Sequence, residues 1–285
     1  MSDNLKEQSD KLKEQDMLGM SELTKTSQQI DTQEGKYVYA IVESAGPKSF
    51  GKIGIGGQGE EVYMVNYDGL SAVVSNSPLV VYDPTRENVM NHERVIEAVM
   101  REFPVIPMSF GTLFKTDQDV TEFLKHTSHA LHEVLDKMKG KIEFGLKVSW
   151  EPEAIIKEVE QDKEEIRKLK EQISKNSRTS TYFARLQLGR LVEQAIEERK
   201  DGVVKNTYDE LRSYAVASRQ NKPIGDKMIL NAAFLVEREK LAEFQQRVDE
   251  LSLKSGGKLR FVLTGPWPPY NFVNIRLKLE GIAPQ

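Results

Sequence analysis

The chain has 285 residues, 39% of them hydrophobic and 29% charged, which suits one large soluble domain or two ordinary ones. A net charge of −4 argues against a nucleic-acid partner held by bulk electrostatics. The absence of cysteine excludes disulfides, thiolate metal sites and cysteine nucleophiles, and no apolar run approaches the ~20 residues of a membrane helix, so we expect a cytoplasmic protein without a membrane span.

Residues 1–35 form a polar stretch that is poor in aromatic side chains and has no signal-peptide core. Asp3–Gln8 and Asp10–Gln15 are near-repeats, but one leucine in each is too few for a stable coiled coil. We expect a flexible polar tail here. A helix that forms only on a partner is the alternative.

The first predicted strands follow from Lys36, beginning with Tyr37–Val42, which is rich in β-forming residues. The glycine-rich run Gly51–Gly57 suggests a phosphate-binding loop. It lacks the Gly-Lys-Ser/Thr ending and opens no helix, so we interpret it as a turn between strands. Beyond it, an Asp-Gly pair predicts a tight hairpin between two further strands, Val62–Tyr67 and Leu70–Ser75.

A helix and a strand are predicted on either side of Pro104. Asp83 is a suitable N-cap with Pro84 as the first helical residue, and Pro104 cannot continue the helix. Because proline has no N–H to donate to a ladder, we expect strand pairing to start only after Pro107 and to continue to Phe114. The core face of the helix is predicted to carry Val89, His92, Ile96, Val99 and Phe103.

A second amphipathic helix is predicted over Asp117–Met138 and is closed by Gly140. Apolar and polar residues then alternate over Ile142–Trp150, which is typical of a half-buried strand. The order of strand, hairpin, helix, strand, helix and strand predicts an α+β domain over residues 36–150, with helices on one face of a mainly antiparallel sheet.

Residues 151–285 are predicted to form a second α+β domain that contains a long helical hairpin. Its helices start at Pro152, with breaks near Lys175–Ser180 and at Asp201-Gly202. The second helix is expected to bury a set of core positions: Tyr182, Leu186, Ala195 and Ile196. A strand, a helix and two more strands then follow, at Met228–Val236, Glu237–Leu253, Leu259–Leu263 and Val273–Leu279.

Two motifs carry a resemblance to a known family. The first is Asn-His-Glu-Arg-Val at Asn91–Val95, followed by Val-Ile-Pro-Met-Ser-Phe-Gly-Thr at Val105–Thr112. The second is Leu-Thr-Gly-Pro-Trp-Pro-Pro-Tyr-Asn-Phe at Leu263–Phe272. In this order they resemble the GvpL/GvpF family of gas vesicle proteins, over most of the chain from Lys36 to Leu279. The resemblance implies a ferredoxin-like N-terminal domain and a role in forming gas vesicles.

The histidines are the first candidates for chemistry. His126, His129 and His132 recur on one predicted helix and could trap a nickel or zinc ion, but no cysteine or Glu-x-x-His spacing accompanies them. His92 and Glu93 could form an acid–base pair, yet adjacent helical residues point about 100° apart. We therefore predict a core histidine at position 92, no catalytic or metal-binding residue and no cofactor.

The loop Gly265–Phe272 is the candidate contact surface. Its three prolines stiffen the backbone, and aromatic side chains on a stiff loop lose little entropy when they bind a partner. The alternative is a rigid loop that caps the core, with its rings turned inward. We predict partner contacts at Trp267, Tyr270 and Phe272.

Two functions are open at this point. The resemblance implies an assembly or minor structural protein that binds the gas vesicle shell subunit and other gas vesicle proteins while the gas-filled shell nucleates or grows. The alternative is a small-molecule-binding enzyme or sensor on a ferredoxin-like scaffold, for which the glycine-rich turn and His92 are the best support. The lack of a catalytic constellation favours the first function, which is not enzymatic.

Overall fold

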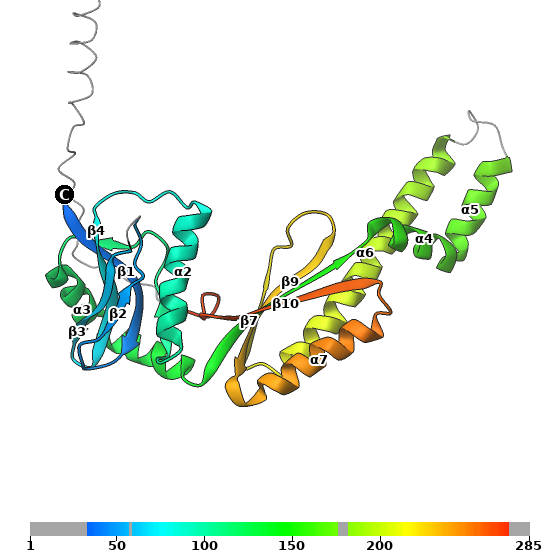
Figure 1. Ribbon diagram of the computed structural model, residues 1–285. Helices are drawn as coiled ribbons and strands as arrows, with labels where there is room; N and C mark the ends of the chain where they lie inside the picture. The colour runs from blue at the N-terminus through cyan, green and yellow to red at the C-terminus, as the bar shows by residue number, and fades with distance from the viewer. Residues whose placement is uncertain (1–32, 57–58, 176–181, 274–285) are drawn as a thin grey trace, which may run out of the picture.

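The computed structural model describes residues 33–56, 59–175 and 182–273, which form two antiparallel sheets with helices packed on them (Figure 1). The α+β class predicted from the sequence is confirmed. The tail predicted up to residue 35 lies almost wholly outside the described residues, as does the strand predicted to run on to Leu279. None of the helices that the structure describes is both long and apolar enough to cross a membrane.

The first sheet contains six strands from the N-terminal half of the described chain: β1 (Glu34–Glu43), β2 (Ser49–Lys52), β3 (Glu61–Tyr67), β4 (Leu70–Pro78), β5 (Val105–Pro107) and β6 (Leu113–Phe114). Their order is β2-β3-β4-β1-β5, and β6 also pairs with β1. The predicted hairpin is confirmed between β3 and β4. Asp68 and Gly69 have φ values of 43° and 82°, as a two-residue turn between antiparallel strands requires.

Two helices, α2 (Arg86–Met100) and α3 (Asp117–Met138), cover opposite faces of this sheet (Figure 1). Ile96 of α2 belongs to the same core cluster as Val73, whereas Leu131 of α3 belongs to a second cluster with Ile41. Neighbouring residues of a strand point to opposite faces, so the central strand β1 is buried along all of Tyr37–Val42. The prediction that the helices share one face is therefore wrong.

The segment around Pro104 also differs from the prediction. The N-cap of α2 is Thr85, whose Oγ1 accepts a hydrogen bond of 3.2 Å from the N–H of Asn88, so the helix begins after the predicted Pro84. β5 already pairs with β1 before Pro107, and Pro107 itself lies opposite Ala40. Because β5 is the last strand in the order of its sheet, a proline there removes no donor that an inner strand would need.

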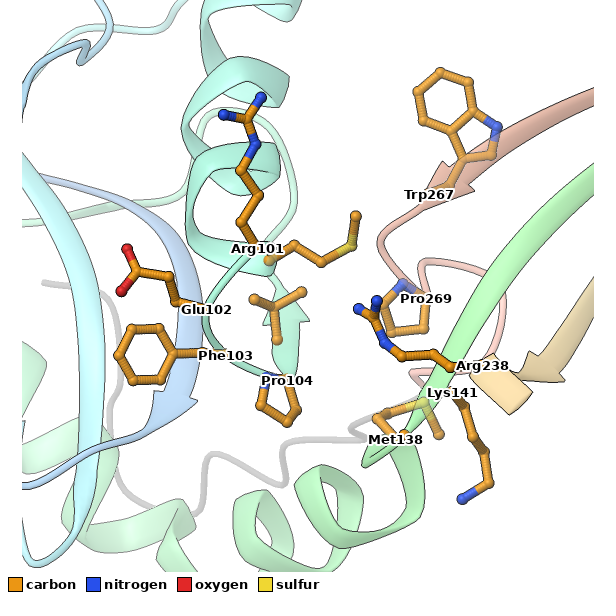
Figure 2. Close-up of a pocket in the computed structure, with 12 residues that line it drawn as sticks. Arg101, Glu102, Phe103, Pro104, Met138, Lys141, Arg238, Trp267 and Pro269 are labelled. Carbon is orange, nitrogen blue, oxygen red and sulfur yellow. The ribbon is translucent and has the colours of Figure 1, made fainter. Parts of the chain in front are cut away.

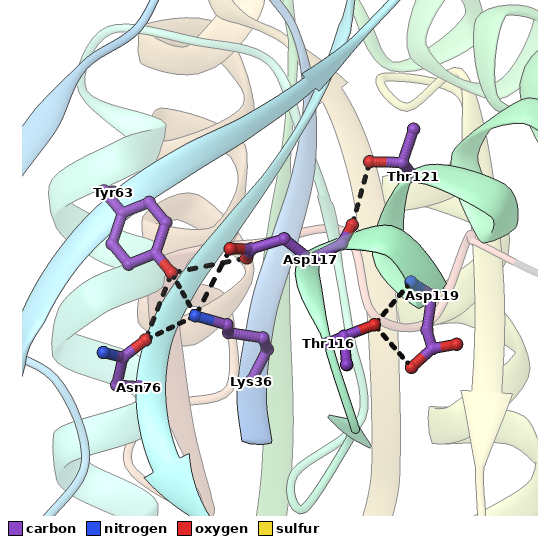
Figure 3. Close-up of polar contacts among 7 residues, drawn as sticks. All are labelled: Lys36, Tyr63, Asn76, Thr116, Asp117, Asp119 and Thr121. Atoms are coloured by element: carbon purple, nitrogen blue, oxygen red, sulfur yellow. Dashed lines mark hydrogen bonds and ion pairs between the residues drawn. The ribbon is translucent and has the colours of Figure 1, made fainter. Parts of the chain in front are cut away.

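A polar network joins the start of α3 to the first sheet (Figure 3). Lys36 Nζ on β1 donates to Tyr63 Oη at 2.8 Å and to Asn76 Oδ1 at 2.7 Å, and it lies 3.4 Å from Asp117 Oδ2. Burial alone would lower the pKa of Lys36, but the hydrogen bond to Tyr63 and the charge of Asp117 raise it above its usual value. The network therefore keeps a charged lysine at the edge of the core.

The second sheet contains four strands: β7 (Lys141–Trp150), β8 (Ala217–Asn221), β9 (Met228–Glu237) and β10 (Leu259–Trp267). Their order is β10-β7-β9-β8, and each pair is antiparallel. The sequence predicts β7 as part of the N-terminal domain, with the boundary near Trp150. It pairs with β9 and β10 along its length, so the chain passes from one sheet to the other at Gly140.

Helices cover one face of the second sheet and extend beyond it: α4 (Pro152–Asp162), α5 (Glu164–Lys175), α6 (Tyr182–Arg212) and, after a short 3₁₀ turn at Arg238–Lys240, α7 (Leu241–Lys254). Helices α5 and α6 lie side by side, which confirms the predicted helical hairpin. This hairpin projects from the second sheet, and we call it the arm (Figure 1).

Two details of α6 differ from the prediction. The helix continues through Asp201-Gly202, because Ala195 and Leu211 on either side of the pair are buried in the core and offset the cost of about 1 kcal/mol for a glycine inside a helix. Tyr182 and Leu186, predicted as core positions, are 66% and 48% exposed. They lie in the first turns of α6, at the outer end of the arm (Figure 1).

Candidate functional site

The histidines of α3 do not converge. His126 and His129 are strongly exposed, and each histidine of the trio lies 3.7–3.9 Å from a different carboxylate, those of Glu122, Glu133 and Glu43. Within the described ranges, no group of three or more His, Cys, Asp or Glu side chains is placed to hold a metal ion.

His92 lies in the core of the first sheet and is 1% exposed. Its Nδ1 is 3.0 Å from Tyr37 Oη, which already accepts a hydrogen bond of 2.8 Å from the N–H of Gly111. The Tyr37 hydroxyl therefore links the ring to the backbone at Gly111, and the tautomer of the ring decides which of the two side chains donates. Burial lowers the pKa of His92 to about 4. No solute reaches this ring without opening the core.

The loop predicted as a contact surface runs from the end of β10 towards the first sheet (Figure 1). Pro268 and Pro269 are buried, so the middle of the loop packs against the rest of the molecule. Trp267 is 37% exposed, and its Nε1–H donates to Thr264 Oγ1 at 3.1 Å. Tyr270 is 37% exposed, and Phe272 is half-buried.

Two carboxylates anchor this loop. Glu143 on β7 accepts hydrogen bonds from Asn271, at 2.9 Å from the backbone N–H to Oε2 and at 2.5 Å from Nδ2 to Oε1. Glu93 on α2 accepts a hydrogen bond of 2.9 Å from the hydroxyl of Tyr270. Burial raises the pKa of both carboxyl groups above the usual value. The loop is thus held to α2 by the half-buried Glu93 and to β7 by the buried Glu143.

Sequence patterns do not predict this junction. Glu143 looks like any polar residue on the outward face of an alternating strand, although it is only 4% exposed. The sequence presents Glu93 only as a possible partner of His92, whereas in the structure His92 contacts Tyr37 and Glu93 contacts Tyr270. The only indication in the sequence is that Glu143 lies between two apolar residues, Ile142 and Phe144. This pattern does not identify Asn271 as its hydrogen-bond partner.

A groove of about 240 Å³ opens beside this junction, where the ends of α2 and α3 meet the second sheet (Figure 2). Val105 and Met138 line its buried floor, and Trp267 stands at its rim. In Figure 2 the guanidinium of Arg238 points into the groove, whereas Arg101 and Lys141 point away from it. The groove offers apolar contact and one cation, and no nucleophile with a base beside it.

The two sequence motifs meet at the junction, since Glu93 belongs to the first and Tyr270 to the second. The model of the family described as gas vesicle synthesis protein GvpL/GvpF matches residues 35–274. The chain belongs to this family. Both motifs of the GvpL/GvpF family therefore take part in one tertiary contact, which joins the two sheets.

Individual members of the family agree with this assignment over nearly their whole length. Gas vesicle protein F of Streptomyces sp. (strain CB03234) is 30% identical over 83% of this chain and 98% of its own. Gas vesicle protein L of the same strain is 27% identical over 86% of this chain and 95% of its own. The crystal structure of GvpF from Anabaena sp. PCC7120 superposes with a TM-score of 0.76 at 26% identity, covering 85% of this chain and 99% of that one.

Proposed function

We propose that this chain is an assembly or minor structural protein of gas vesicles. It binds the main shell subunit and other gas vesicle proteins while the shell nucleates or grows, and it stays associated with vesicles in the cytoplasm. It acts through its surface and not through catalysis. Membership of the GvpL/GvpF family supports the link to vesicles.

The observation that carries shell-subunit binding is an apolar hollow at the β5/β6 end of the first sheet. It measures about 540 Å³ and is lined mainly by apolar residues of two segments, 79–82 and 110–115. Val81 is 97% exposed and Val80 is 38% exposed. Exposed apolar surface of this kind, beside a strand at the end of a sheet, marks contact sites for apolar or extended partners. A shell subunit that is apolar and rich in β-structure fits that chemistry.

The loop that joins the sheets contributes a second contact region in this proposal. Trp267 is the best placed of the three predicted contact residues, because its ring stands at the rim of the inter-sheet groove (Figure 2). Tyr270 and Phe272 stay predicted contacts, with Tyr270 also bound to Glu93.

The test combines a pull-down with the isolated shell subunit and complementation of a strain that lacks this chain. We expect wild-type chain to bind the subunit and to restore vesicles. Val81→Ser should weaken both, whereas Leu253→Ser, at an 80% exposed leucine of α7 in the other part of the molecule, should weaken neither. Normal vesicles in cells without this chain would remove the assembly role. Equal binding by the two variants would remove the hollow as the contact site.

A further inference from the structure

The arm ends in apolar side chains that the described chain leaves uncovered. Tyr182, Phe183 and Leu186 are 66%, 80% and 48% exposed, and the two aromatic rings contact each other with centroids 5.4 Å apart. Together these three residues form what we call the arm tip. By contrast Ile166, on the facing helix α5, is 1% exposed. The arm buries its apolar positions near the sheet and exposes them at its end.

The helical spacing of Tyr182 and Leu186 predicts a buried face, yet no described part of the chain reaches them. An exposed apolar cluster costs solubility unless a partner covers it. Aromatic side chains are also the usual anchors of protein interfaces, because they bury a large area at low entropic cost. The arm tip therefore has the composition of one half of an interface.

The charge around the arm tip selects the kind of partner. The outer ends of the two helices, residues 171–175 and 182–190, carry one lysine and two arginines against one glutamate, whereas the whole chain has a net charge of −4. Farther from the tip, Lys168 is paired with Glu164 and Lys170 with Glu160. The three cations near the tip have no carboxylate partner among the described residues: Lys175, Arg185 and Arg190.

Two other partners fit this surface less well. A second copy of the arm would bring the same positive charge against it, which disfavours tip-to-tip pairing. A membrane surface is bound by helices with a long apolar face, but here the strongly exposed apolar residues are confined to the first two turns of α6. A compact apolar cluster with an excess of positive charge beside it fits an acidic protein surface with an apolar pocket.

We propose that the arm tip docks on an acidic surface of another gas vesicle protein, with Phe183 as the apolar anchor and Arg185 and Arg190 facing carboxylates. The inference rests on the proposed function, since it names a surface and a partner chemistry for the same assembly role. It assigns to the arm a contact separate from the apolar hollow of the first sheet.

The experiment places a benzophenone photo-cross-linking side chain at position 183 of the full chain, in vesicle-forming cells that lack the wild-type copy. We expect a cross-link to a segment rich in Asp and Glu of a gas vesicle protein, identified by mass spectrometry. The double variant Arg185→Glu with Arg190→Glu should lower the cross-link yield about 10-fold or more, as loss of central interface residues does. The same probe at position 253, on α7, should give no such cross-link.

A second experiment compares the vesicle yields of cells that carry different variants. Tyr182→Ser combined with Phe183→Ser should reduce the yield, and Leu253→Gln combined with Arg260→Glu, an exposed pair elsewhere, should not. Circular dichroism checks that each variant folds. If Tyr182→Ser with Phe183→Ser does not fold, Arg185→Glu with Arg190→Glu still tests the proposal. The proposal would be overturned by a cross-link only to a second copy of the chain, or by a cross-linked segment that is poor in Asp and Glu. It would also be overturned if the variants lost binding to phosphatidylglycerol lipid vesicles in parallel with their loss of gas vesicle yield. Failure of the wild-type chain to change vesicle yield would instead overturn the proposed function.

Discussion

The hydroxyl of Tyr270 donates a hydrogen bond of 2.9 Å to Oε1 of Glu93, across 177 positions of sequence. Glu93 lies on α2, against the first sheet, and Tyr270 follows the last strand of the second. The other oxygen of Glu93, Oε2, is buried and has no hydrogen-bond partner among the described residues. The hydrogen bond from Tyr270 therefore offsets part of the free-energy cost of desolvating this carboxylate at the junction.

Replacing Tyr270 tests that relationship. In Tyr270→Phe neither oxygen of Glu93 keeps a hydrogen-bond partner within the described part of the chain, so we expect the free energy of unfolding to fall by about 1–3 kcal/mol. Urea denaturation of the full chain measures it. Tyr182→Phe removes the hydroxyl of an exposed tyrosine on the arm and should change stability by less than about 0.5 kcal/mol. Similar losses in the two variants would show that the bond to Glu93 contributes nothing.

The charge of Glu93 predicts an unusual pH dependence. Burial raises the pKa of this carboxyl in the folded chain above the ordinary value of 4.5, so between those two values the folded state holds the proton more tightly than the unfolded state. Its contribution to stability is then largest below pH 4.5 and is lost as the pH rises through the raised pKa. Glu93→Gln keeps an acceptor for Tyr270 and removes the charge.

We therefore expect Glu93→Gln to be more stable than the wild type at pH 7 to 8, with the difference shrinking as the pH approaches 4.5. Thermal unfolding over a pH series measures this trend. Asp136→Asn removes the same charge from an exposed site on α3 and controls for the change in net charge. A Glu93→Gln curve parallel to that of the wild type would contradict the burial argument.

Sequence patterns predicted the elements whose limits are set locally. The bounds of α3 agree with the prediction, since a threonine cap, an amphipathic face and Gly140 all act within a few residues. The hairpin at Asp68-Gly69 could be predicted for the same reason. Its turn needs two residues with positive φ, and an Asp-Gly pair provides them.

What the patterns could not supply was the identity of distant partners. The alternation in β7 shows that one face is buried, but its neighbours β9 and β10 come some eighty residues or more later in the chain. The helical spacing at Tyr182 and Leu186 is the same whether the partner lies inside the chain or outside it. In the sequence Glu93 and Glu143 look like ordinary surface residues. Only the structure shows that Tyr270 and Asn271 bind them.

His92 predicts a pH dependence of the opposite sign. Its pKa falls from 6.5 to about 4 on burial, so the unfolded chain binds the proton more readily between these values. Stability from the neutral ring is fully present above pH 6.5, and about 3 kcal/mol of it is lost as the pH falls to 4. His92→Asn keeps an acceptor near the position of Nδ1 for Tyr37 and cannot take up a proton.

The expected result for His92→Asn is a lower stability at pH 7, from the smaller side chain, and a flatter curve between pH 6.5 and 4. The measurement is denaturant unfolding at each pH. His129→Asn, at a histidine whose side chain is 90% exposed, should leave the shape of the curve unchanged. If the two variants show the same slope, the buried ring is not the titrating group.

The cap of α3 gives a local prediction with a neighbouring control (Figure 3). Thr116 Oγ1 accepts a hydrogen bond of 3.1 Å from the N–H of Asp119 and donates one of 2.8 Å to its carboxylate, so it satisfies a donor at the helix start. Thr116→Ala should lower the free energy of unfolding by about 1 kcal/mol. The hydroxyl of Thr121 donates to the carbonyl of Asp117, which is inside the helix. Thr121→Ala should therefore lower the free energy of unfolding by less, because alanine also has the higher helix propensity.

Because α3 covers a whole face of the first sheet, loss of its cap should also speed amide hydrogen exchange at Val120 and Phe123. Exchange rates that do not change there, with stability equal in the two variants, would mean that packing alone holds the start of the helix.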